Sequence, residues 1–564
     1  MKNKGFAILI LVVICFVITS CSMFGGDGYI FSTEGDATVC IRGVSDKSYG
    51  ELTLPLQGET DYGNMRVTVV DANAFQGNKS ITSLTVPEGY RRIEEGAFKD
   101  CVNLETVKLP STLEYIAPDA FEGCTKLKYE TVGDLVYLDT WLVGNNGSYA
   151  ESYTVREGTY YIKAGVFCED EKENDVTKSI TLPQSLLRIE EEAFRSCRAL
   201  EEIVIPGSVK VIPASAFDFC SSLKKVEIGE GVEEIQKLAF CDCPIEEISI
   251  PSTVKDIQAF GVPEVEKVDG FGYADGWLVR YYSSNATYNV TPREGTVGIA
   301  GGVFSEDVTS VNVVDSIKYI SDEAFAKNRH LLTVTGLEGV EYVGDKAFYE
   351  CKALDTIIFG SKLKEIGESA FASCEDLKTV GLGNSLEVIS REAFAYCESL
   401  GKGGFSLPDS VKWIGAFAFK ESPGVAVRYQ GRSGVYVGNW LVQDVMVGAT
   451  EIPDNSLIGG ITGGTVSNDG GLVIKSGTVG IAAGVFNSNF ALKSVTIPSS
   501  VKYIGENAFG MNNYDIICEN KTGWVAYSRT YDDIKINLSS QQVSNLRSLL
   551  FHAYSDLVLV NETN

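Results

Sequence analysis

The residue types that carry most enzyme and metal chemistry are scarce or scattered in this sequence. The 564-residue chain has two histidines, His330 and His552, which are far apart, so a site with several histidine ligands is not expected. It has no Gly-x-Ser-x-Gly nucleophile motif, no His-Glu-x-x-His helix and no Walker phosphate loop. Residues 270–275 begin like a dinucleotide-binding loop but lack its third glycine. We therefore predict no catalytic residue, no cofactor-binding residue and no metal site.

Two further clusters could bind cations, but neither has the required spacing. Residues 169–175 are mostly acidic and do not follow the ligand spacing of an EF-hand, so a solvated loop is expected. Cys241 and Cys243 flank Asp242, and a metal site there would need two more ligands that no adjacent segment supplies. Paired carboxylates do not indicate a glycosidase in a chain with 75 acidic residues, because such pairs then arise by chance.

Cys21 is the one cysteine whose sequence context predicts a covalent modification. Lys2 and Lys4 precede an apolar run at residues 6–18, which is too short to span a bilayer and suits the core of a signal peptide. Residues 18–21, Ile-Thr-Ser-Cys, resemble a bacterial lipobox, with Ile and Thr in place of the commoner residues. The resemblance implies a signal peptide at 1–20, lipidation at Cys21, and a tether at 21–28. The alternative is a plain secretory signal in which Cys21 is coincidental.

The charge balance narrows the classes of partner. The chain has 48 basic against 75 acidic residues, a formal charge of −27. A nucleic-acid partner is not expected, because its phosphates require a basic surface.

The Ser at position 22, after the predicted lipidated Cys, is typical of lipoproteins that reach the outer membrane. No later stretch is long and apolar enough to cross a bilayer, so the lipid would be the one membrane contact.

A repeat dominates the rest of the chain and must position any functional side chain. A Phe recurs after Ala, or in Gly-Val-Phe, at sixteen places once Phe417 is left out in favour of the in-frame Phe419, and eight of the intervals are 23 residues long. These marker residues are Phe75, Phe98, Phe121, Phe167, Phe194, Phe217, Phe240, Phe260, Phe304, Phe325, Phe348, Phe371, Phe394, Phe419, Phe486 and Phe509. Such a period predicts a solenoid rather than three or four separate domains.

Each repeat unit contains one short strand and one tight corner. Residues 104–110 read Leu-x-x-Val-x-Leu-Pro, in which alternating apolar residues point inward and Pro ends the strand. A Val-x-x-Ile-like segment continues along the next side, and the marker Phe then fills the interior of the coil. Stacking is required, because one coil cannot bury its own apolar face.

The unit resembles the BspA-type leucine-rich repeat family of bacterial surface proteins. Residues 501–509 (Val-Lys-Tyr-Ile-Gly-Glu-Asn-Ala-Phe) and 366–374 (Ile-Gly-Glu-Ser-Ala-Phe-Ala-Ser-Cys) match its repeat closely, and the match covers about residues 50–515. The resemblance implies a right-handed leucine-rich-repeat solenoid with a parallel sheet on one face. It also implies an adhesin-like surface protein without catalytic activity.

Eight of the 14 cysteines lie three residues after a marker Phe. Export of the chain would favour disulfide bonds between these cysteines. Equivalent positions in stacked coils instead favour a buried row of free thiols, and this is what we predict. These residues are Cys101, Cys124, Cys197, Cys220, Cys243, Cys351, Cys374 and Cys397.

Three related segments interrupt the repeat near residues 130–167, 268–304 and 430–486. Each carries a Trp-Leu-Val motif that begins at Trp141, Trp277 or Trp440, and each predicts a hairpin-like insert in one coil. The Trp residues are expected to be packing anchors rather than partner contacts. Tyr149, Tyr281 and Tyr282 are candidate insert contacts, with packing an equal alternative.

The ends of the solenoid are predicted to be caps. Residues 29–66 form a β-rich N-terminal cap that merges into the first repeat, and the solenoid occupies 67–515. Residues 516–564 form the C-terminal cap, in which residues 541–554 have helix-like apolar spacing.

The outward positions of the strands give the candidate binding face. They include Glu105, Lys108, Glu201, Glu202, Lys224, Lys225, Glu246, Glu247 and Lys378. The function expected is a cell-surface lipoprotein that binds protein, of the host matrix or of a neighbouring cell, through this face and the inserts. The alternatives are a glycan-binding or glycan-processing accessory, a structural envelope protein, and a face that is merely soluble.

Overall fold

The computed structural model describes most of the repeat region and parts of both ends. The described residues are 23–24, 29–34, 38–44, 50–60, 63–168, 173–282, 289–304, 308–425, 427–428, 435–443, 471–486, 493–509, 515–528, 535–538, 540, 543 and 557–562. The predicted signal peptide and Cys21 lie outside them, as does most of the third insert. Every element bounded within the described residues is a β-strand. No helix among them is long and apolar enough to cross a membrane.

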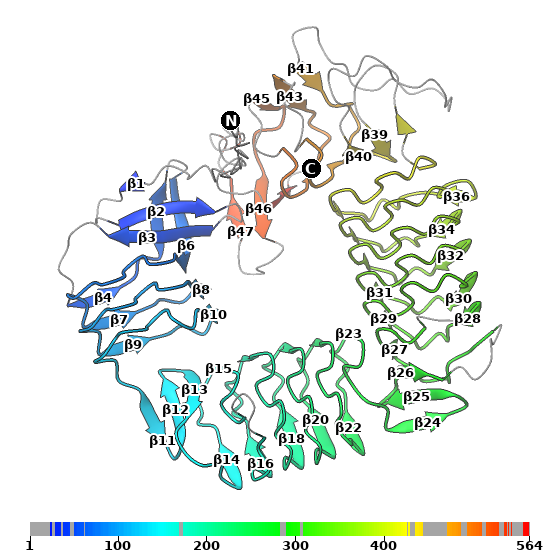
Figure 1. The fold of residues 1–564 in the computed structure, drawn as a ribbon. Coiled ribbons are helices and arrows are strands. Elements are labelled where there is room, and N and C mark those ends of the chain that lie inside the picture. Colours follow the sequence, from blue (N-terminus) through cyan, green and yellow to red (C-terminus); the bar gives the residue numbers. More distant parts are fainter. Residues whose placement is uncertain are drawn as a thin grey trace, which may run out of the picture.

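The chain forms a β-solenoid of about 17 turns spaced about 23 residues apart, which confirms the predicted fold class. Figure 1 shows straight stacks of coils joined at corners into an open ring. Two parallel ladders run along the stacks. We call the one on the convex side of the ring the outer ladder and the one on the concave side the inner ladder.

The outer ladder is built from the Leu-x-x-Val-x-Ile segments, in which alternate residues are buried. Val226 of β20, for example, pairs with Ile203 of β18 and Ile248 of β22, and all three are buried. Its strands are β4 (Glu51–Thr53), β7 (Ser83–Thr85), β9 (Thr106–Lys108), β14 (Ser152–Thr154), β16 (Ser179–Thr181), β18 (Glu202–Ile205), β20 (Lys225–Ile228), β22 (Glu247–Ser249), β28 (Ser310–Asn312), β30 (Thr333–Leu337), β32 (Thr356–Phe359), β34 (Thr379–Gly381), β36 (Gly404–Phe405), β41 (Gly471–Val473), β43 (Ser494–Ile497) and β45 (Asp515–Cys518).

The inner ladder consists mainly of two-residue strands, in which the second residue is an inward Ile or Val. The first residue points outward, toward the concave side. The strands are β6 (Gly63–Val70), β8 (Arg92–Ile93), β10 (Tyr115–Ile116), β15 (Tyr161–Ile162), β17 (Arg188–Ile189), β19 (Val211–Ile212), β21 (Glu234–Ile235), β23 (Asp256–Ile257), β27 (Gly298–Ile299), β29 (Tyr319–Ile320), β31 (Tyr342–Val343), β33 (Glu365–Ile366), β35 (Val388–Ile389), β37 (Trp413–Ile414), β42 (Gly480–Ile481) and β44 (Tyr503–Ile504).

The marker Phe side chains form the predicted interior ladder. Their rings stack nearly parallel from coil to coil, with centroids between 4.7 Å (Phe325–Phe348) and 5.6 Å (Phe394–Phe419). Burial of one Phe is worth ~1.5–3 kcal/mol, so the ladder supplies a large part of the core.

Phe260 is the exception, and the prediction that it fills the interior is wrong. Its side chain is 53% exposed. In a regular coil, the amide of a marker Phe donates to the carbonyl of the residue before the next marker. The amide of Phe240 instead donates to the carbonyl of Gly261, which precedes Val262. Val262, which is 2% exposed, therefore occupies the core position. The Ala-Phe dipeptide here is two residues out of register. The interval of 20 residues after Phe240, in place of the usual 23, is the sequence feature that could have revealed this shift.

The eight repeat cysteines are free thiols and are buried, as predicted. Each Sγ donates to the carbonyl oxygen of the marker Phe in the preceding coil, at 3.0–3.2 Å in seven of them and 3.8 Å for Cys197. Asn328 and Ser422 occupy the cysteine position in two coils and donate to Phe304 and Phe394 in the same way. The position therefore requires a small buried donor.

Each insert is an antiparallel meander whose third strand joins the inner ladder. The first comprises β11 (Glu130–Val132), β12 (Leu135–Leu138) and β13 (Trp141–Asn145). The second comprises β24 (Glu266–Val268), β25 (Phe271–Ala274) and β26 (Trp277–Tyr281). The third comprises β38 (Val427–Arg428), β39 (Val435–Val437) and β40 (Trp440–Gln443). The inserts lie at the corners of the ring (Figure 1).

The insert tryptophans are packing anchors, as expected, because none is more than 4% exposed. The rings of Trp277 and Trp440 lie across the glycines of the next coil. A Cβ on Gly298 or Gly480 would meet an indole carbon at 2.4 Å. Each ring also stacks on a Tyr one coil further, Tyr319 or Tyr503, with centroids 5.9 Å apart.

Strands cover both ends of the stack. At the N-terminal end, β1 (Met23–Phe24), β2 (Tyr29–Glu34) and β3 (Thr38–Val44) are antiparallel, β3 lies parallel to β6, and β5 (Gln57–Thr60) is antiparallel to β6. At the C-terminal end, β48 (Leu557–Asn561) pairs with both β44 and β46 (Trp524–Ser528), and β47 (Lys535–Asn537) completes the cap. These cap strands cover the edge of the inner ladder at each end. The helix expected at 541–554 lies outside the described residues except for Val543, which is buried.

A pair of substitutions tests the register of the core. Phe217→Ala should lower the free energy of unfolding by about 3–5 kcal/mol, because it leaves a cavity between two stacked rings. Phe260→Ala removes the same side chain from the surface and should cost less than about 0.5 kcal/mol. Urea denaturation followed by tryptophan fluorescence measures both. Equal losses would contradict the placement of Phe260.

Candidate binding surface

The nine side chains predicted to form a binding face all belong to the outer ladder or directly precede its strands. Eight of them are exposed, and Glu105 is half-buried. The parallel register brings equivalent positions of successive coils side by side, so the side chains form rows across the coils. The predicted residues therefore share one surface.

Most of these charges are paired between neighbouring coils. Lys224 lies 2.7 Å from Glu246, Lys225 lies 3.3 Å from Glu247, and the amine of Lys128 lies 2.6 Å from Glu105. The hydrogen bond from Lys128 lowers the pKa of Glu105, and the hydrogen bond to Glu246 raises the pKa of Lys224. Exposed pairs like these add little stability. What they produce is an ordered surface on which the two signs alternate.

The sequence reasoning missed the apolar part of the same surface. The central residue of the Val-x-Ile motif also points outward, and in several coils it is a large aliphatic side chain. Val204 and Ile358 are both 52% exposed, and Val473 and Ile517 are also exposed. The sequence could have indicated this apolar surface, because an apolar residue stands at the outward central position of the motif in these coils.

The three insert tyrosines are half-buried. Tyr281 packs between Phe271 and Phe304, with centroids 5.2 and 5.6 Å away. The hydroxyl of Tyr282 donates to Glu264, and the amine of Lys267 lies 3.4 Å from the centre of its ring. Tyr149 is half-buried in the first insert. Their role as partner contacts stays a prediction.

A cavity of about 210 Å³ opens at the second corner of the ring. It is lined by Lys237, Gln258, Ala259, Asp322, Glu323, Asp345 and Lys346.

The coil before the second insert contacts the coil after it directly at this cavity. The amide of Asp322 donates to Oδ1 of Asp256 at 3.0 Å, and the amide of Ile257 donates to the hydroxyl of Ser321 at 3.0 Å. Burial raises the pKa of Asp256 to about 6. Burial, with the charges of Asp256 and Asp345, raises the pKa of Asp322 to about 8.

One protein family matches the chain when its sequence is compared with models of known families. The chain matches the family described as BspA type leucine rich repeat region (6 copies) over residues 64–171, 145–260, 300–426 and 471–557. No curated protein matches it.

Several solved structures resemble the chain. A leucine rich cell surface protein from Faecalibacterium prausnitzii A2-165 is 22% identical, with 72% of this chain and 93% of that chain covered and a TM-score of 0.22. A leucine-rich repeat protein from Bacteroides ovatus ATCC 8483 is 18% identical over 88% and 100% of the two chains, with a TM-score of 0.21. The pneumococcal vaccine antigen PcpA is 15% identical over 89% and 99%, with a TM-score of 0.24.

The acid pair at the second corner predicts a pH dependence of stability. A carboxyl whose pKa is higher in the folded than in the unfolded state binds more protons when folded, so its contribution to stability falls as the pH rises from about 4 to about 8. Asp322→Asn keeps the acceptor for the amide of Asp345 and removes the charge. We expect it to raise Tm by about 2 °C at pH 8 and to have little effect at pH 5.

Thermal unfolding at both pH values measures this effect. Asp315→Asn, at an exposed site away from the cavity, is the matched control and should change Tm at neither pH. A lower Tm of the Asp322→Asn variant at pH 8 would contradict the proposed repulsion between the carboxylates of Asp322, Asp256 and Asp345.

Proposed function

The chain belongs to the BspA-type leucine-rich repeat family of bacterial surface proteins, and from that premise we propose that it is a surface-anchored, non-catalytic protein that binds a protein partner. The partner proposed is a protein of the host matrix or of a neighbouring cell surface. The contact proposed is the outer ladder, with the inserts contributing at the corners.

The outer ladder supports this proposal because it combines the two features of a protein-binding surface. Exposed aliphatic side chains such as Val204 and Ile358 can be buried by a partner, and the surrounding charges can fix its orientation. The aligned coils repeat this arrangement along the convex side of the ring. A nucleic acid is a poor partner for a chain with a formal charge of −27.

A glycan is the second candidate, and one local feature favours it. Glycan-binding surfaces commonly use exposed aromatic rings, and the insert tryptophans are buried. Tyr396 and Phe417, however, are 41% and 49% exposed at the end of the third stack. The amine of Lys420 lies 5.1 Å and 5.5 Å from the centres of their rings.

Anchoring is proposed through Cys21, on the sequence context of residues 18–21. A single lipidated N-terminus would hold the solenoid at the outer membrane, and exposure at the cell surface is proposed with it.

A charge-reversal series tests the binding surface. Lys224→Glu with Lys225→Glu should weaken binding to a captured matrix protein about 10-fold or more, because it replaces two attractive positions with repulsive ones. The matched control is Lys255→Glu with Lys412→Glu, two exposed and ion-paired lysines on the inner-ladder side. It should leave affinity unchanged.

Binding is measured by surface plasmon resonance against a panel of host matrix proteins, with a glycan array in parallel. Saturable binding to a glycan and to no protein would overturn the protein-binding proposal. Loss of protein binding in the control variant alone would indicate that the partner contacts the concave side instead of the outer ladder.

The lipid anchor has its own test. Cys21→Ala should abolish incorporation of radiolabelled palmitate and shift the exported protein from the membrane fraction to the soluble fraction. A membrane-bound Cys21→Ala variant without label would show that another segment anchors the chain.

A further inference from the structure

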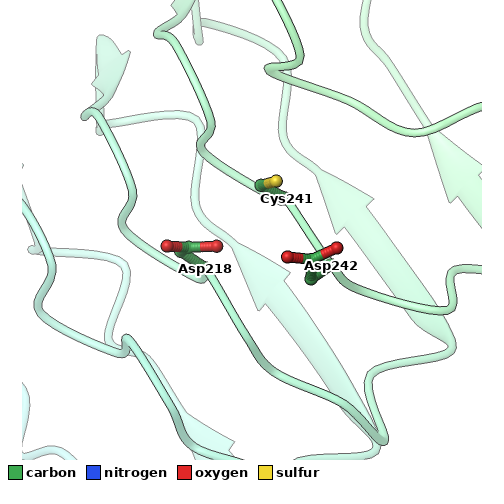
Figure 2. A group of neighbouring side chains, drawn as sticks. All are labelled: Asp218, Cys241 and Asp242. Atoms are coloured by element: carbon green, nitrogen blue, oxygen red, sulfur yellow. The ribbon is translucent and has the colours of Figure 1, made fainter.

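Three metal-ligating side chains meet on two successive coils of the second stack. Asp218 follows the marker Phe217, and Cys241 and Asp242 follow the marker Phe240. The 23-residue register places Asp218 beside Cys241, because both are the first residue after a marker. One carboxylate oxygen of each Asp and the Sγ of Cys241 all lie within 4.8 Å of one another. Figure 2 shows the carboxylate of Asp218 turned toward that of Asp242, with the thiol of Cys241 beside them.

Asp218 is a buried carboxylate with an unsatisfied oxygen. Its residue is 6% exposed, and its side chain is 9% exposed. Oδ2 lies 3.5 Å from Nε of Arg195 on the preceding coil. Oδ1 is buried and has no hydrogen-bond partner among the described residues. A buried, unpaired acceptor oxygen is uncommon in proteins and is expected to have a donor or a cation beside it.

The surroundings favour a cation over further negative charge. Two carboxyl groups and one thiol lie within 4.8 Å of one another. Three groups that lose protons thus share one site, and Arg195 approaches only one oxygen of one of them.

The thiol two residues further on is not part of the group. Sγ of Cys243 points into the coil and donates to the carbonyl oxygen of Phe217 at 3.0 Å. The Cys-Asp-Cys sequence therefore does not chelate a metal by itself. The third ligand comes from the preceding coil, which alignment of the coils reveals and the local motif does not.

We propose that Asp218, Cys241 and Asp242 bind a divalent transition metal, for which Zn²⁺ is the best chemical match. Zn²⁺ accepts a mixture of thiolate and carboxylate ligands, whereas Ca²⁺ and Mg²⁺ require oxygen alone. A tetrahedral site would take water as the fourth ligand. Bond lengths of ~2.0–2.3 Å bring ligand atoms to roughly 3.5 Å from one another, so the exposed Asp242 and the half-buried Cys241 would close by side-chain rotation.

Binding replaces the thiol proton by the metal and releases that proton to solvent, so affinity should increase with pH. The ion would join two adjacent coils through ligands on both. Its occupancy should therefore raise the thermal stability of the chain.

The experiment uses Co²⁺ as a spectroscopic probe on the purified protein under reducing conditions. We expect one Co²⁺ per chain, a thiolate-to-cobalt charge-transfer band in the near ultraviolet, and displacement of that band by Zn²⁺. Cys241→Ser should abolish the band. Asp242→Asn, an exposed and conservative change, should weaken Co²⁺ affinity about 10-fold or more and tests the site if the cysteine variant fails to fold.

Cys168→Ser is the matched control, because Cys168 is also a half-buried thiol directly after a marker Phe and lies outside the group. It should keep the band and the affinity. Absence of a stoichiometric band in the unaltered protein would overturn the proposal. A band that survives Cys241→Ser and Asp242→Asn but is lost in Cys168→Ser would also overturn it.

Discussion

The structure depends on hydrogen bonds that each coil can make only with its neighbours at the Ala-Phe corner. The amide of Phe217 donates to the carbonyl of Ala239 in the next coil, and the carbonyl of Phe217 accepts from the thiol of Cys243 in that coil. A coil without a neighbour would leave these buried groups unpaired, and an unpaired group costs about 1–3 kcal/mol. The stacked Phe rings add apolar burial at the same place. Hydrogen bonds and packing therefore impose the same register, and a shift of one residue would break both.

This register explains the interruptions as well as the regular coils. An insert interrupts the outer ladder, and the coils on its two sides contact each other directly. At the second corner Asp256 and Ser321 supply the contacts, and at the third the amide of Ala483 donates to the carbonyl of Ile414. The buried indole of Trp277 fills the space over Gly298, where any side chain would collide with it. The corners that shape the ring are therefore built from residues that the repeat itself does not contain.

The sequence predicts the interior well because the period determines it. Marker Phe residues at 23-residue intervals, the inward Ile residues and the free thiols all follow from spacing alone. Phe260 shows the limit, because a dipeptide match two residues out of register placed an exposed ring in the core. The half-burial of Tyr281 could not be predicted, because it depends on how the second insert folds back onto Phe271 and Phe304. Contacts between segments that the period does not relate need the structure.

The exterior follows a different logic, because the register determines where an outward side chain lies but not which residue it must be. Pairs such as Lys224 and Glu246 are ion-paired within the coil stack itself. Two departures differ from such pairs: Ile358 on the outer ladder leaves an apolar side chain 52% exposed, and Oδ1 of Asp218 beside Cys241 is buried without a hydrogen-bond partner among the described residues. Neither departure follows from the repeat, so we look for a reason for these residues in what they contact outside the coil stack. In a repeat protein of this kind, functional positions are best sought where a coil departs from the repeat and the fold does not require the departure.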